Sequence, residues 1–196
     1  NVSPSRQMNK NAGNHSSGHP WWEMGSGEYI RGLGLPGSVW GSGFSNGYSR
    51  NIVAPPRYGN YIGADMLVSI HNNGGRGCGT ETWYDNNNGY QDQSRELAIL
   101  IQNKVVERLR SQWDANWCDR GVKGSNHGYG EIRYFNGPAV IVELAFMDTQ
   151  SNNDALKNAT FRSIAMTAVR DAIQEYYEGS TTPPPSSSTF SGNPSS

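Results

Sequence analysis

The chain has 196 residues, which is enough for one well-cored domain and too few for two of ordinary size. Charged residues make up only 17% and the formal net charge is -1, so the composition gives no electrostatic reason to expect nucleic acid or an anionic membrane as partner. No apolar run approaches the ~20 residues that a membrane span requires. The 24 glycines and the 11% of aromatic residues are typical of an extracellular protein with long polar loops, so we expect a secreted or cell-envelope location.

The first sixty residues are rich in Gly, Asn, Ser, Pro and Trp and show little periodicity. They predict a long aromatic and glycine-rich loop region, with one helix near Ser26–Leu33 and another near Ser49–Tyr61. Long loops are uncommon in compact domains unless they are functional. Trp21, Trp22 and Trp40 offer flat faces for sugar rings; the alternative is that they pin the loop to the core.

The remainder of the chain alternates strand and helix patterns. The predicted elements are strands at Ala64–Ile70, Thr80–Tyr84 and Pro138–Phe146 and amphipathic helices at Ser94–Trp113 and Asn158–Tyr177. Ser94 is the predicted N-cap of the first long helix. Strands alternating with long helices indicate a three-layer α/β domain with a mostly parallel central sheet flanked by helices.

The C-terminal residues 179–196 contain Ser, Thr and Pro with no charge and almost nothing apolar. Such a segment cannot bury enough surface to offset its ordering entropy, and three consecutive prolines favour an extended spacer. We therefore predict a linker at 179–196 after a domain at 1–178. Within the domain, Cys78 and Cys118 either form a disulfide or are two buried free thiols, and the extracellular composition favours the disulfide.

Two residues stand out chemically. His71 comes where a buried strand meets a Gly-rich segment, and ligands of open α/β sheets bind beyond the carboxyl ends of strands; the alternative is a structural histidine. Glu143 lies within the apolar run Val140–Phe146, where a carboxylate is costly to bury without a partner. A metal, a cation or a catalytic role would explain it, and the structural alternative is an ion pair with Arg133 or Lys123.

Four ordered blocks of the sequence resemble one family, the zinc-dependent amidase-3 enzymes that cleave the bond between N-acetylmuramic acid and L-alanine in peptidoglycan. The blocks are Ala64–Gly74, Gly79–Tyr84, Arg120–Lys123 and Pro138–Asp148. The resemblance runs in register from about Arg50 to Tyr177. It implies that the chain is the catalytic domain of an N-acetylmuramoyl-L-alanine amidase with peptidoglycan as its substrate.

The resemblance also implies roles for individual residues. His71 matches a zinc ligand, and Glu143 matches the catalytic glutamate that faces the metal. Zn²⁺ lowers the pKa of bound water and polarises the amide carbonyl, while a carboxylate within reach takes the proton of that water and passes it to the leaving amine. Asn73 and Arg133 are the candidate substrate-binding residues.

A catalytic zinc needs three protein ligands, and the family motifs that supply the other two are not visible in the sequence. Val2–Arg6 resembles the end of the family's second strand. We therefore expect a domain that is incomplete at its N-terminus, with the missing segment present physically as a separate chain, as a further part of the polypeptide or as a strand from a neighbour. Alternatively His15 and His19 supply the ligands, although a groove-lining loop is favoured for them. His127 is expected in a loop near the substrate.

The sequence is also compatible with a second function. The chain could be a non-catalytic, wall-associated structural or glycan-binding protein built on a degenerate amidase scaffold. The presence of His71 and Glu143 favours the enzyme, and the missing ligand motifs favour the binding protein.

Overall fold

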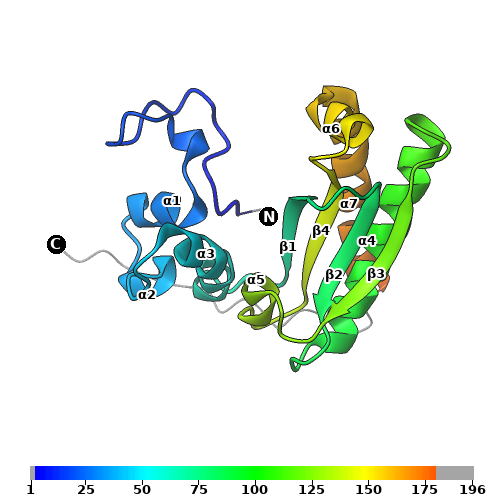
Figure 1. The fold of residues 1–196 in the computed structure, drawn as a ribbon. Helices are drawn as coiled ribbons and strands as arrows, with labels where there is room; N and C mark the ends of the chain where they lie inside the picture. Colours follow the sequence, from blue (N-terminus) through cyan, green and yellow to red (C-terminus); the bar gives the residue numbers. More distant parts are fainter. Residues whose placement is uncertain (1–2, 180–196) are drawn as a thin grey trace.

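Four strands form one sheet in a computed structural model that describes residues 3–179 (Figure 1). In chain order the elements are the 3-10 helix η1 (Trp21–Glu23), α1 (Ser26–Gly32), α2 (Gly37–Trp40), α3 (Gly47–Tyr61), β1 (Leu67–Asn73), β2 (Thr80–Asp85), α4 (Gln91–Gln112), β3 (Asp119–Ser125), α5 (Gly130–Arg133), β4 (Ala139–Phe146), α6 (Gln150–Lys157) and α7 (Ala159–Gly179). The predicted linker lies outside the described residues apart from Gly179. None of the described helices combines the length and the apolar character needed to cross a membrane.

The strand order is β1-β4-β2-β3. The outer pairs, β1 with β4 and β2 with β3, are parallel, and the central pair of β4 and β2 is antiparallel. Helices flank this sheet, so the predicted α/β class with a mostly parallel sheet is confirmed. The sequence patterns did not predict β3, because Asp119–Ser125 is polar and contains two glycines; it becomes a strand by pairing with β2.

The two faces of the sheet have different partners. Successive side chains of a strand point to opposite faces. From β4, Val140, Val142 and Leu144 join the main core with α4 and α7, while Ala139 and Ile141 join a smaller cluster around α5. Helices α4 and α7 thus form the layer behind the sheet in Figure 1, and α5, backed by α3, lies on the other side. By the same alternation Glu143 shares the face of Ala139 and Ile141.

Several element boundaries differ from the sequence prediction, and two of these differences bear on the site. Helix α4 begins at Gln91, so the prediction of Ser94 as N-cap is wrong. The Ser94 side chain is buried, and its Oγ accepts a hydrogen bond from the Ala139 backbone N–H at 3.1 Å, which ties the helix to β4. Strand β1 continues to Asn73, so His71 lies inside the strand rather than after it. Strand β1 lies at an edge of the sheet. The described residues do not test whether a further segment of the domain pairs with it, so that expectation stays a prediction.

The N-terminal region contains both predicted helices, as α1 and α3, together with η1 and α2. A small core of Ile30, Val39 and Ala54 joins α1, α2 and α3, and Trp40 packs against it. Trp21 packs against Gly32, whereas Trp22 is 39% exposed. Trp21 and Trp40 thus make packing contacts, and a role of the tryptophans in binding sugar rings stays a prediction. Residues 3–6 form no strand in the structure.

The disulfide between Cys78 and Cys118 is confirmed, with a Cα–Cα distance of 5.8 Å. It joins the segments that lead into β2 and β3, so a covalent bond supports the parallel pairing of these two strands.

Candidate active site

A row of ionisable side chains crosses the sheet on the face that α5 partly covers. His71 on β1 is the register partner of Glu143 on β4, and Glu143 is the register partner of Glu81 on β2. Paired residues of neighbouring strands point to the same face, and neighbouring strands lie about 4.8 Å apart. The fold thus brings together three ionisable side chains from three different strands.

His71 is held by two polar neighbours. Its Nε2 lies 2.8 Å from Glu131 Oε2 and 3.0 Å from Ser69 Oγ, and Ser69 Oγ donates to Glu131 Oε1 at 2.7 Å. The hydrogen bond to Glu131 raises the pKa of His71, and the negative charges of Glu131 and Glu143 add to this effect, against burial and the nearby Arg6. Glu131, in the first turn of α5, had no signal in the sequence, because its role depends on the docking of α5 against β1.

Glu143 has a different environment. Its Oε2 is buried and has no hydrogen-bond partner among the described residues. Burial raises the pKa of Glu143, and the charges of Glu81 and Glu131 raise it further, while His71 acts in the opposite direction. An ion pair of Glu143 with Lys123 or Arg133, the structural alternative, is absent from the described part of the chain. A buried carboxyl group with a raised pKa is typical of residues that exchange protons at functional sites.

Glu81 is the residue of this row that stays negatively charged at neutral pH. The residue is only 3% exposed, and its carboxylate accepts hydrogen bonds from Lys123 Nζ, from Arg120 Nε at 2.6 Å, from Asn73 Nδ2 at 2.8 Å and from Trp83 Nε1 at 2.9 Å. Burial alone would raise the pKa of Glu81, but these donors outweigh it and lower the pKa to about 2. The structure thus places Asn73 beside the row, oriented by Glu81.

Arg133 is the last residue of α5 and makes no hydrogen bond or ion pair with these side chains among the described residues. Its Nη1 donates to the His127 carbonyl at 3.0 Å, and its guanidinium group stacks on Tyr134 at 4.5 Å from the ring centroid. His127 itself pairs with the buried Asp85, with 3.1 Å between Nδ1 and Oδ2. Of the predicted site residues, the structure brings His71, Asn73 and Glu143 together and leaves Arg133 apart.

The candidate metal ligands do not come together in the structure. Within residues 3–179 no group of three or more His, Cys, Asp and Glu side chains is arranged to hold a metal ion. His15 contacts Ser17 and lies 3.8 Å from Glu28, and His19 lies 3.7 Å from Glu23, so neither histidine joins His71. His71 and the adjacent Glu131 are two possible donors, and the described residues do not complete a zinc site around them.

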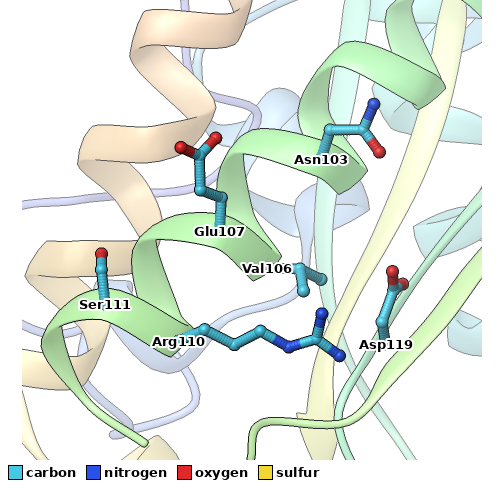
Figure 2. A pocket seen from close by; sticks show the side chains of 6 residues that line it. All are labelled: Asn103, Val106, Glu107, Arg110, Ser111 and Asp119. Atoms are coloured by element: carbon cyan, nitrogen blue, oxygen red, sulfur yellow. The ribbon is translucent and has the colours of Figure 1, made fainter. Parts of the chain in front are cut away.

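A hollow of about 520 Å³ lies elsewhere, on α4 and the start of β3 (Figure 2). Its lining residues are Asn103, Val106, Glu107, Arg110, Ser111 and Asp119. In Figure 2 the Arg110 side chain extends from α4 toward Asp119, and Arg110 Nε donates to the Trp117 carbonyl at 3.0 Å. The hollow is open and shares no residue with the row around Glu143, so we place the candidate active site on the sheet face.

The chain is similar to proteins of known sequence. Two proteins of Bacillus subtilis strain 168, the uncharacterised protein YqiI and the N-acetylmuramoyl-L-alanine amidase LytC, are each 36% identical to the chain over 118 residues. These matches cover 59% and 58% of this chain, and 52% and 22% of the relatives. The chain thus spans about half the length of YqiI and about a fifth of LytC.

Solved structures show the same fold. An N-acetylmuramoyl-L-alanine amidase from Clostridium difficile 630 is 28% identical, with a TM-score of 0.57 and coverage of 65% of both chains. The CwlD amidase of Clostridioides difficile, solved in complex with the GerS lipoprotein, is 26% identical, with a TM-score of 0.57 and coverage of 68% of this chain and 64% of that one. The family described as N-acetylmuramoyl-L-alanine amidase (amidase_3) matches residues 48–175, the segment that contains the whole row. The chain belongs to this amidase_3 family.

Proposed function

We propose that the chain takes part in hydrolysing the amide bond between N-acetylmuramic acid and L-alanine in peptidoglycan, with Glu143 as the catalytic acid and base. The observation that carries this proposal is the state of Glu143. It is a carboxyl group with a raised pKa and an unpartnered, buried Oε2, directly opposite His71 within the family match. A group of this kind can accept a proton from an attacking water molecule and return it to the leaving amine.

Neighbouring side chains support this proton transfer. Glu81 keeps a negative charge beside Glu143, which increases the proton affinity of Glu143 without competing for the same proton, since Glu81 has a pKa of about 2. Asn73 is oriented by Glu81 and presents its amide next to the row, where we propose that it binds substrate. We keep Arg133 as a candidate substrate-binding residue at the far end of α5.

His71 is the one residue of the described chain that we propose as a metal ligand. We propose His71 as one ligand of Zn²⁺, which needs two further protein ligands that residues 3–179 do not bring to it. We also propose that 1–178 forms the catalytic domain, that 179–196 is a linker, and that the protein acts outside the cytoplasm. The disulfide between Cys78 and Cys118 supports the location, because such bonds persist in oxidising compartments.

The competing function is a wall-associated glycan-binding or structural protein on an amidase scaffold. The incomplete donor set around His71 is the observation that favours it. Digestion of purified sacculi separates the two functions. With the two further zinc ligands in place, we expect the zinc-loaded protein to release peptides with a free L-alanine amino group, and Glu143→Gln to lower the rate by at least about 100-fold.

The matched control is Glu107→Gln, an exposed glutamate on α4 away from the sheet face, which should retain full activity. Zinc-loaded protein that releases no peptide would favour the binding protein. A Glu143→Gln variant as active as the parent chain would remove Glu143 from the mechanism.

A further inference from the structure

The buried carboxylate of Glu81 is paired with two cations rather than one. Arg120 Nε and Lys123 Nζ, both from β3, contact the same Oε2 atom. One negative charge against two positive charges leaves an excess of one positive charge at this end of the row. The Arg120 and Lys123 side chains are 37% and 31% exposed, so the excess charge is open to a ligand, whereas Glu81 is shielded beneath it.

The two cations are held in place and still have free donors. The guanidinium group of Arg120 lies over the Phe146 ring at 5.0 Å, and Lys123 Nζ lies over the Trp83 ring at 5.2 Å. Arg120 uses only Nε toward Glu81, and its two terminal amino groups make no hydrogen bond among the described residues. A guanidinium group with a free edge has the geometry that binds a carboxylate through two parallel hydrogen bonds.

The location of the pair fits one part of the proposed substrate. Glu143, Glu81 and the two cations lie on β4, β2 and β3, three consecutive strands of the sheet. Two strand spacings of about 4.8 Å separate β4 from β3. An extended peptide advances about 3.3 Å per residue, so a chain that leaves the scissile amide at Glu143 reaches β3 after about three residues. Arg120 and Lys123 extend from β3 back to Glu81 on β2, which brings them toward the second residue of such a chain.

We infer that Arg120 and Lys123 bind a carboxylate on the peptide side of the scissile amide, carried by the residue that follows L-alanine, with Glu81 as the positioning residue. This inference rests on the proposed function, because it takes Glu143 as the place of cleavage. It also gives the substrate a direction. The peptide extends over β2 and β3, and the sugar lies on the β1 side of Glu143.

The test uses two muramoyl dipeptides, N-acetylmuramoyl-L-alanyl-D-glutamate and its α-carboxamide, with the γ-carboxyl group capped in both. Binding is measured by calorimetry in the full chain carrying Glu143→Gln, so that no turnover occurs. We expect the free carboxylate to bind about tenfold more tightly than the carboxamide. Adding Arg120→Gln should abolish this preference, and adding Arg120→Lys should retain part of it. Lys104→Gln, at a cation that pairs with Glu175 on α7, is the control and should preserve the full preference.

The result that overturns the inference is an Arg120→Gln variant that weakens both dipeptides equally, since that pattern indicates a structural role alone. A carboxylate preference that survives the combined Arg120→Gln and Lys123→Gln changes also overturns it. Sacculus digestion by the parent chain separates this inference from the proposed function. A carboxylate preference without peptide release rejects the catalysis and supports the binding site. Peptide release without a preference rejects the binding site alone.

Discussion

Glu81→Gln is the change for which the structure gives the clearest magnitude. In the folded protein the pKa of Glu81 falls from its usual 4.5 to about 2. A tenfold change in proton affinity is worth about 1.4 kcal/mol, so this fall corresponds to about 3 kcal/mol of stability. Arg120 and Lys123 are each about one-third exposed, and water weakens their attraction to the carboxylate. We therefore expect Glu81→Gln to lower the free energy of unfolding by about 2 kcal/mol at pH 7.

The dependence on pH identifies the cause. Because the folded pKa is lower than the unfolded one, the contribution is fully present above pH 4.5 and is lost as the pH falls through about 2. Urea unfolding at pH 7 and at pH 3 should show that the difference between the parent chain and Glu81→Gln shrinks by at least about half. Glu107→Gln should differ from the parent by less than about 0.5 kcal/mol at pH 7. A Glu81→Gln difference that is the same at both pH values would refute the electrostatic reasoning and leave a packing defect as the explanation.

Two further predictions concern the same end of the sheet. Replacing Cys78 and Cys118 together by Ser should cost up to about 4 kcal/mol, because the chain-entropy model assigns about this much to a loop with a sequence separation of 40, and thermal unfolding without reductant measures it. An unchanged melting temperature would contradict that estimate. Gly79→Ala places a Cβ 1.9 Å from the Cys118 carbonyl oxygen and should cost about 3 kcal/mol or more. Gly13→Ala has a similar φ of +81° but open space and should cost only about 1 kcal/mol, so equal losses would exclude the steric clash.

Local sequence patterns predicted those helices and strands whose own residues show a clear hydrophobic periodicity or apolar run. The apolar run around Val142 and the alternation of Thr80–Tyr84 became β4 and β2, because burial and periodicity are properties of a few neighbouring residues. Strand β3 has no such signal and depends on pairing with β2 and on the disulfide. Ser94 carries a local signal that was misleading. Its hydroxyl group suits a helix N-cap, but in the structure it binds the backbone of β4.

The same distinction holds for the site. His71 and Glu143 were recognisable because each departs from its local surroundings and matches a family block. Glu131 and the pairing of Glu81 with the cations of β3 were not, because they join residues 39 to 60 positions apart. Side chains alternate along β2, so Glu81 points to the face away from Thr80 and Thr82, which face α4. This alternation was the available sign in the sequence that Glu81 shares a face with Glu143.

The disulfide has a consequence for the chain when a protease attacks it. Residues 78 to 118 form a covalently closed ring that contains β2, the connection through Asn86–Gly89 and all of α4. A single cut anywhere inside this ring leaves both fragments joined through sulfur. The strand that holds Glu81 and the strand that holds its two cations therefore stay on one molecule after such a cut, and they separate only when the bond is also reduced.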